Sequence, residues 1–306
     1  MPPLVDSPTA WLQSCKAPEC SVDAAARDRL EGLLGTELTD VRSLGGQHGV
    51  RHYQLTTDDD RLVFAKIADA DPQGFAAEAA GLRFLGEAQA APVPAVIATD
   101  ETCLLIEWIN EDHSATREAA VAFGHELAAL HDAGADHFGA PWPGEIAGLP
   151  LPNDQADEWP QWYVANRLLP YLRIASDAGT LSATDTRLIE AAGARSSELA
   201  GRPEPPSRIH GDCWSGNVLW SGGRGWLIDP AAHGGHRETD LAMLALFGAP
   251  HLDQILAGYD EVSQLEAGWR SRIPLHQLHP LLVHVCLFGS AYRESALAAA
   301  RAVLAA

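Results

Sequence analysis

The chain is poor in positive charge, and lysine is its scarcest charged residue. The 306 residues include 21 basic and 41 acidic side chains, which gives a formal charge of −20. Only Lys16 and Lys66 are lysines. A surface that binds nucleic acid in general, or an anionic membrane, needs a basic patch. We therefore expect neither nucleic acid nor a membrane as a partner.

Long apolar runs and a disulfide framework are also missing. The nearest approach to a membrane-spanning run, residues 281–288, is short and contains His284. The first six residues have no basic segment before an apolar run, so we expect no secretory leader. The cysteines are odd in number and scattered, without the paired C-x-x-C motifs of a zinc site. This usage favours a reduced, cytoplasmic setting. The five are Cys15, Cys20, Cys103, Cys213 and Cys286.

One short stretch carries most of the chemical information. Four residues separate Asp212 from Asn217, and Asp229 closes an apolar segment soon afterwards. Two strand-like segments, 218–220 and 226–228, flank a glycine-containing turn between them. A lone Asp or Asn usually belongs to a turn or a cap. Turn or cap roles do not readily explain the combination of this spacing with the flanking strands.

This spacing is typical of phosphotransferases of the protein-kinase type. In that chemistry one Asp receives or orients the substrate hydroxyl, while an Asn and a second Asp hold metal against the nucleotide phosphates. The transition state is loose, so the protein mainly positions groups and supplies metal-borne charge. The sequence therefore predicts Asp212 as the catalytic base, with Asn217 and Asp229 as metal ligands.

Lys66 is a second candidate, because this chain uses arginine almost everywhere else. It lies in the strand-like segment 62–67, and a compact ammonium suits a crowded phosphate pocket better than a broad guanidinium. A solvated strand lysine is the alternative. Apolar residues at helical spacing predict a helix over 73–88. We expect Glu78 on that helix to pair with Lys66, with Glu87 as the less favoured choice.

Two further segments could contact a nucleotide. Gly45 and Gly46 begin a glycine-bearing turn between two predicted antiparallel strands, and such a turn can cover phosphates. The glycine pattern is incomplete, so an ordinary hairpin is the alternative. The predicted strand 103–109 runs into a linker, where backbone groups around Glu107 and Ile109 would hydrogen-bond an adenine.

The character of the sequence changes near residue 110. Before it, a helix at 22–35 is followed mainly by predicted strands, whereas helical patterns dominate afterwards. We predict an α+β fold with two lobes and a cleft near 107–112. The small β-rich N-lobe covers 1–109, and the larger, mainly helical C-lobe covers 110–306.

Several details of the second half are also predictions. Ser114 is expected to cap a helix that runs through Leu130, and the Pro- and Gly-rich segment 137–160 to be a loop. That loop could wall a substrate cleft or simply pack on the surface through its aromatic side chains. Thr239 and Asp240 are expected to open a helix. Further helices are expected over 160–178, 181–200 and 241–247, and then to the end with breaks near Pro250 and Pro274.

The catalytic stretch resembles the fructosamine kinase (ketosamine 3-kinase) family. The likeness lies in residues 210–217, in Ile-Asp-Pro-Ala at 228–231, and in Gly-His-Arg-Glu-x-Asp-Leu-Ala-Met at 235–243. It extends over most of the chain and is strongest from 160 to 295. The pair Trp214-Ser215 separates this chain from aminoglycoside and choline kinases, which are similar around His-Gly-Asp. Further segments that resemble the family are 167–170, 246–248 and 287–292.

The resemblance implies a protein-kinase-like fold, ATP and Mg²⁺ as cofactors, and a small amine-linked sugar as substrate. It implies that Lys66 and Glu78 orient phosphates. For the acceptor we expect contacts from Trp214 and His210, although Trp214 could equally pack into the large lobe. Two departures are present. Gln47-His48 stands where many members carry a cysteine, so a redox switch there is not expected, and Cys213 replaces the usual leucine.

Alternatives from the sequence are a kinase of an aminoglycoside, a hexosamine or another small hydroxyl compound, and a nucleotide-binding pseudokinase. The complete set of Lys66, Asp212, Asn217 and Asp229 argues against the pseudokinase. A metal hydrolase is a third alternative, but its histidines follow turn residues and do not share a helix face. It would use His210, Asp212, His233 and His236. The acceptor hydroxyl and the oligomeric state stay open.

Overall fold

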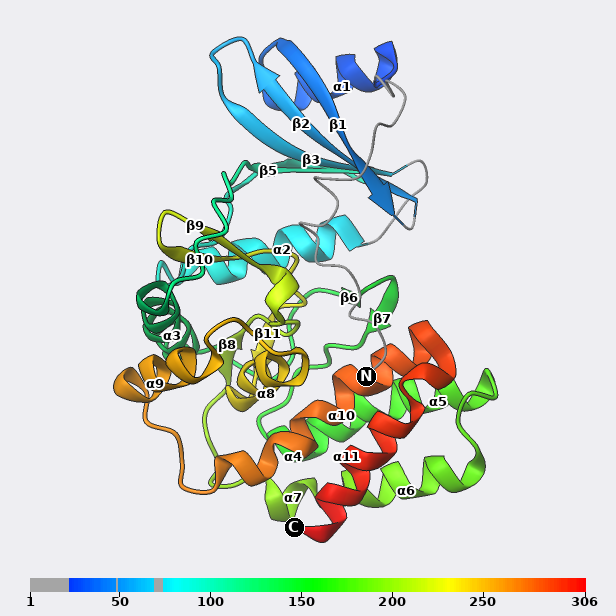
Figure 1. The fold of residues 1–306 in the computed structure, drawn as a ribbon. Helices are drawn as coiled ribbons and strands as arrows, with labels where there is room; N and C mark the ends of the chain where they lie inside the picture. The colour runs from blue at the N-terminus through cyan, green and yellow to red at the C-terminus, as the bar shows by residue number, and fades with distance from the viewer. Residues whose placement is uncertain (1–21, 48, 69–73) are drawn as a thin grey trace.

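The computed structural model describes residues 22–47, 49–68 and 74–306. An antiparallel five-stranded sheet forms the N-lobe, in the order β1-β2-β3-β5-β4 (Figure 1). The other strands of the described chain form separate two-stranded pairs, so the predicted two-lobed α+β fold is confirmed. The sheet consists of β1 (Leu38–Gln47), β2 (Val50–Thr57), β3 (Leu62–Ala68), β4 (Val96–Thr99) and β5 (Cys103–Glu107).

Alternation of side chains builds the sheet's core. Along β2, Tyr53 and Leu55 are fully buried while Gln54 between them is partly exposed, as the two-residue period of a strand requires. Helix α1 (Ala24–Leu34) covers this face with Leu30. Its ends are set locally, because the Asp23 side chain accepts the N–H of Ala26 at 2.8 Å and Gly35 takes a left-handed conformation.

Helix α2 (Gly74–Glu87) confirms the helix predicted over 73–88 and connects the lobes. Phe75, Ala79 and Leu82 pack on β5, whereas Leu85 joins the apolar cluster of the C-lobe. Figure 1 shows the helix below the sheet, at the level of the hairpin formed by β9 (Val218–Ser221) and β10 (Arg224–Leu227). A helix anchored in both cores can hold a side chain at a fixed place between them.

The linker between the lobes is fastened to the same hairpin. The Asp112 amide donates to the Trp220 carbonyl at 3.0 Å, and Ser221 Oγ donates to the Asn110 carbonyl at 2.6 Å. The division into 1–109 and 110–306 stays a prediction. The described structure adds that the linker is held by the hairpin that follows the catalytic stretch.

The C-lobe is mainly helical. Helix α3 (Arg117–Asp132) lies directly on α9 (Leu252–Val262), because a Cβ on Gly124 would approach the Ile255 carbonyl oxygen to 2.2 Å. The other helical elements are α4 (Trp159–Tyr163), the π-helical turn η2 (Val164–Leu168), α5 (Leu169–Asp177), α6 (Ala183–Ala194), α7 (Ser196–Leu199), η3 (Ser215–Asn217), α8 (Glu238–Phe247), α10 (Trp269–Phe288), η4 (Gly289–Ala291) and α11 (Arg293–Ala305). The remaining strand pairs are β6 (Gly144–Ile146) with β7 (Leu149–Leu151), and β8 (Ser207–Ile209) with β11 (His233–Gly235).

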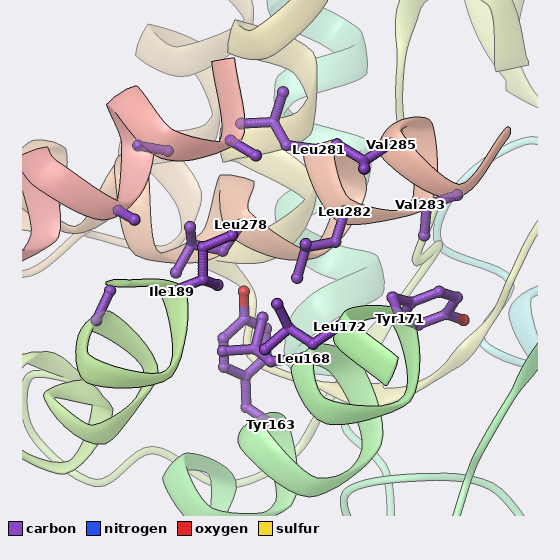
Figure 2. Packing of buried hydrophobic residues seen from close by; sticks show 14 of the residues in the cluster. Tyr163, Leu168, Tyr171, Leu172, Ile189, Leu278, Leu281, Leu282, Val283 and Val285 are labelled. Carbon is purple, nitrogen blue, oxygen red and sulfur yellow. The ribbon is translucent and has the colours of Figure 1, made fainter. Parts of the chain in front are cut away.

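Helix α10 is the centre of the largest apolar cluster. Figure 2 shows Leu278 and Leu282 facing Leu168 and Leu172 of the neighbouring helices. Tyr163 lies among them, and its hydroxyl donates to the Leu275 carbonyl at 2.6 Å. Burial of each such side chain contributes about 1.5–3 kcal/mol. Within the described ranges, none of the helices combines the length and apolarity needed to cross a bilayer.

Three predictions for the C-lobe need correction. The N-cap of α3 is Thr116, whose side chain accepts the Ala119 amide at 3.1 Å, while Ser114 bonds to Asp112 instead. The segment 137–160 contains the β6–β7 hairpin and is not simply a loop. Helix α10 continues through Pro274, because its buried leucines outweigh the lost backbone hydrogen bond.

Candidate active site

Lys66 lies between two carboxylates from different parts of the chain. Its Nζ is 2.8 Å from Glu78 Oε1 on α2 and 2.5 Å from Asp229 Oδ1, which follows β10. The lysine is placed by the pairing of β3 with β2 and β5, and the glutamate by the apolar face of α2. The structure thus contains the ion pair predicted from the order of strand and helix.

The electrostatics favour a permanently charged lysine. Burial alone would lower the pKa of Lys66, but the carboxylates of Asp229 and Glu78 outweigh it and raise that pKa. Burial also works to raise the pKa of Asp229, yet the ammonium holds it below its ordinary value. Removal of the ammonium would leave two carboxylates facing each other, and a buried like-charge pair is strongly unfavourable.

Asp212 and Asn217 meet within the catalytic stretch. Asn217 Nδ2 donates to Asp212 Oδ2 at 2.9 Å and to the Asp212 carbonyl at 3.0 Å, with a longer contact of 3.4 Å to the Asp229 carbonyl. Since Nδ2 faces these acceptors, the amide oxygen is the atom of Asn217 that could bind a metal. Burial, with the negative charge of Asp229 and Asp240, raises the pKa of Asp212 to about 7.

The donor set of Asn217 and Asp229 fits a hard divalent cation. Mg²⁺ takes oxygen ligands and usually needs only one or two carboxylates besides phosphate. The Asp229 side chain is 42% exposed, so it remains accessible to a ligand. Its backbone φ of 52° is rare for a residue with a Cβ and is held by the packed strands around it.

Asp240 holds the backbone of residues 210–211, just before Asp212. Its position at a predicted helix start does not suggest this role. Its carboxylate is fully buried and accepts the backbone amides of His210 at 2.7 Å and Gly211 at 2.9 Å. His131 Nε2 contacts it at 3.1 Å. The sequence signal was available in Glu-x-Asp-Leu-Ala at 238–242, but only the fold reveals the partners.

The expectation that His210 contacts the acceptor is wrong. Its side chain is fully buried, Nε2 donates to the Ile228 carbonyl at 2.9 Å, and Nδ1 accepts the Asp212 amide at 3.3 Å. Both ring nitrogens are therefore occupied within the loop. His210 connects the loop that bears Asp212 to the strand that leads to Asp229, and so sets their relative position.

The metal-hydrolase alternative finds no support in this geometry. His233 Nδ1 donates to the Ala231 carbonyl at 2.8 Å, so this ring is turned to its own backbone. His236 Nδ1 accepts the Glu238 amide at 3.2 Å. Among the described residues, neither histidine joins His210 and Asp212 in a cluster with metal-ligand spacing.

The prediction that Gly45 and Gly46 begin a turn is wrong, because both lie in β1 and pair with His52 and Arg51 of β2. β1 and β2 pair up to Gln47 and Val50, and a Cβ on Gly46 would lie 2.3 Å from the Val50 carbonyl oxygen. Gly45 has φ of 98°, which favours glycine. His48, which bears on the proposed absence of a redox switch, lies outside the described residues. Contact of Gly45 and Gly46 with phosphates stays a prediction.

Glu107 ends β5, and Ile109 lies in the linker without regular structure. The Glu107 amide donates to the Ala95 carbonyl at 2.9 Å, and the Glu107 carboxylate accepts the Ala95 amide at 3.2 Å. These bonds hold the end of the strand against the segment before β4. An adenine contact from this backbone stays a prediction.

Trp214 is partly exposed beside Asp212. Its ring lies over Gly216, where a Cβ would come within 2.3 Å of it, and meets the Phe247 ring edge-on at 6.0 Å. The Phe247 ring continues to His284 at 4.9 Å. Trp214 thus both braces the loop and presents ring surface, so the two readings of the sequence are compatible.

Comparison with known proteins finds relatives that match most of the chain. The family model described as fructosamine kinase matches residues 25–306. A protein of Synechocystis sp. named as a probable ketoamine kinase is 33% identical over 248 residues, covering 78% of this chain and 82% of its own. The chloroplastic protein-ribulosamine 3-kinase of Arabidopsis thaliana is 29% identical, covering 86% of this chain and 82% of its own.

Solved structures give the same result. A Thermobifida fusca protein described as a fructosamine-3-kinase is 50% identical and superposes with a TM-score of 0.90, over 94% of this chain and all of that one. An aminoglycoside phosphotransferase in complex with AMP-PNP and hygromycin B is 17% identical, with a TM-score of 0.63 over 91% of this chain and 99% of its own. The second likeness shows the fold alone.

Proposed function

This chain belongs to the fructosamine kinase family, and we propose that it transfers the γ-phosphoryl group of ATP to a hydroxyl of a ketosamine, with Asp212 as the base. The observation that carries the proposal is two pairs of contacts. Lys66 contacts both Glu78 and Asp229, while Asn217 links Asp212 to Asp229. A cation for phosphates, a base and a pair of oxygen ligands therefore lie in one continuous network.

The acceptor oxygen attacks the γ-phosphorus while its proton passes to Asp212. The bond between that phosphorus and its bridging oxygen breaks, and ADP leaves. A base works best when its pKa lies near the working pH, and burial raises the pKa of Asp212 to about 7. The Asn217 amide holds the carboxylate in place without taking its proton-accepting role.

On the nucleotide side, Asn217 and Asp229 are the proposed ligands of Mg²⁺. The metal, when bound, neutralises charge that develops on the transferred phosphoryl group. Lys66 is the proposed phosphate contact, and Glu78 keeps its ammonium directed toward the metal ligands. The bond between Lys66 and Asp229 supports this arrangement, because it places the lysine that would contact phosphate beside a proposed metal ligand.

We propose that the exposed part of the Trp214 ring receives the sugar. A flat apolar face suits a sugar ring, and the contacts with Gly216 and Phe247 fix that face beside Asp212. A small amine-linked sugar is the acceptor class we expect. The relatives named as ketoamine and ribulosamine kinases support this choice.

A panel of acceptors tests the proposal. Amino acids linked to fructose or ribulose are offered with ATP and Mg²⁺, and ADP release is followed with the mass of the product. Glucosamine, an aminoglycoside and the unmodified amino acids are the matched controls. We expect a phosphorylated product and ADP release with the ketosamines alone. Turnover restricted to the aminoglycoside, or ADP release without any phosphorylated acceptor, would refute the assignment.

The Trp214→Leu variant tests the acceptor contact separately. We expect it to raise the KM for the ketosamine and to leave the KM for ATP unchanged. A rise in the KM for ATP alone would show that the ring only braces the loop.

A further inference from the structure

A small cavity lies beside Gly211, the residue before Asp212. Its volume is about 10 Å³. The side chains that matter for its chemistry come from η2, β11 with the turn after it, and α10, and Gly211 closes it toward the loop. They are Arg167, Trp162, His233, His236 and His279. None of the residues that line this cavity carries a carboxylate.

Arg167 brings an uncompensated positive charge into this place. The residue is 2% exposed, and its guanidinium stacks over the Trp162 ring at 4.4 Å. Its hydrogen bonds go only to neutral acceptors, the carbonyls of Pro152 and Asn166 and the side-chain oxygen of Asn153. Within the described part of the chain no carboxylate forms an ion pair with it, and Nε has no hydrogen-bond partner.

Such an arrangement is costly for the protein alone. A buried charge is normally paired, and removing its partner destabilises the fold strongly. Burial lowers the pKa of Arg167 to about 9, which still leaves it charged at neutral pH. The cavity therefore has a fixed positive charge and a donor that the chain does not satisfy.

One neighbouring histidine adds an N–H donor. His236 Nδ1 accepts the Glu238 amide, so the proton of this neutral ring is on Nε2. His279 Nε2 is buried without a partner in the described structure. His233 is also neutral, because burial holds its pKa far below the ordinary value; its proton is on Nδ1 and bonds to a carbonyl, so its Nε2 adds no donor to the cavity.

A metal ion is the wrong occupant for the adjacent cluster. His236, Glu238 and His276 have ligand atoms within 4.8 Å of one another. However, both Glu238 oxygens are bonded to Arg272, at 2.9 and 2.5 Å. The Nε2 atom of His236 carries a proton, so it has no lone pair for a cation.

We propose that the cavity binds one monatomic anion, chloride, as the counter-ion of Arg167. The cavity volume of about 10 Å³ gives room for the centre of one small particle and not for a polyatomic ion. Phosphate, sulfate and carboxylates are too large for it. A water molecule has a suitable size, but it would leave the charge of Arg167 uncompensated, and the tests below separate the two occupants.

Bromide provides a direct test on the unaltered protein. Crystals of the wild-type chain are grown with sodium bromide in place of chloride, and anomalous diffraction is measured at the bromine edge. We expect one anomalous peak in the cavity, within hydrogen-bond distance of Arg167 Nε. Electron density there without an anomalous signal would identify a water molecule and overturn the proposal.

Unfolding in matched salts provides a second test. The equilibrium is measured in sodium chloride and in sodium gluconate at constant ionic strength. One bound chloride predicts that each tenfold rise in chloride above the dissociation constant raises the folded-to-unfolded ratio tenfold. Arg167→Met should abolish this dependence, and Arg173→Met, which alters an exposed arginine on α5, should retain it. Equal stability of the wild type in both salts would overturn the proposal, and the bromide result decides if Arg167→Met does not fold.

Discussion

The Asp212→Asn substitution tests whether Asp212 acts as the catalytic base or only holds the loop in place. Asp212 Oδ2 accepts one hydrogen bond from Asn217 Nδ2 at 2.9 Å. An asparagine has nearly the same shape, and its Oδ1 can accept that bond. The loop, the orientation of Asn217 and both metal ligands should therefore survive, while the ability to accept a proton is lost.

The expected loss of rate follows from the role of the base alone. A positioned general base typically contributes about 10²–10⁴-fold, which corresponds to about 2.7–5.5 kcal/mol of barrier. Single-turnover transfer should slow by that factor in Asp212→Asn. The affinity for MgATP should stay close to the wild-type value, because the proposed ligands Asn217 and Asp229 are untouched.

Asp212→Ala and Asp229→Asn are the matched comparisons. Asp212→Ala also removes the bond to Asn217, so it should weaken MgATP binding in addition to the rate. Asp229→Asn removes a carboxylate from the proposed metal site and from Lys66, so nucleotide binding should suffer first. A wild-type single-turnover rate in Asp212→Asn, with a loss only in Asp212→Ala, would show that Asp212 merely holds Asn217.

Three further predictions concern other parts of the molecule. Lys66→Met should abolish productive ATP use, and unchanged turnover would refute the phosphate role. Because Glu78 and Asp229 lose their shared cation in this variant, the variant's unfolding free energy, measured with urea, should fall. The fall should disappear at a pH low enough to protonate one of the two carboxylates. Gly124→Ala should destabilise the fold in urea titrations because the new methyl group meets the Ile255 carbonyl, whereas the matched helical change Gly32→Ala, with open space around it, should stabilise it by about 0.5–1 kcal/mol. Burial lowers the pKa of His236 to about 3, so its contribution to stability is complete above pH 6.5 and is lost as the pH falls. His236→Phe should therefore take up about one proton fewer than the wild type on unfolding near pH 5, which appears as a shallower dependence of the unfolding free energy on pH. The same pH dependence in both proteins would contradict this.

Local patterns sufficed for the elements that carry the chemistry. The spacing of Asp212, Asn217 and Asp229 could be read directly, because the two strands and the turn between them follow in the sequence. The pairing of Lys66 with Glu78 could be predicted from the apolar face of α2, which fixes how that helix turns toward the sheet. In each case a short segment determines its own geometry.

Errors arose where tertiary contacts override local preference. Pro274 carries a strong signal for a helix end, yet α10 passes through it, because the leucines that follow it are buried in the cluster that includes η2 and α5. Ser114 is a good cap in isolation, but its bonds to Asp112 compete with that role. Those bonds depend on the linker, whose path is set by the hairpin of β9 and β10.

His210 and Asp240 show most clearly why the rest of the site could not be read from the sequence. A histidine beside a catalytic aspartate suggests chemistry, but this one is enclosed and its two nitrogens bond to backbone. Asp240 occurs at a helix start, where such residues are common. Its importance depends on two amides, of His210 and Gly211, that lie about 30 residues earlier in the chain and reach it only after folding. The proposed catalytic and metal-binding residues follow a sequence motif, whereas those that hold the motif in place are defined by burial and by partners distant in sequence. Asp240→Asn should therefore alter the loop, and through it the rate, without changing any group that contacts ATP or the acceptor.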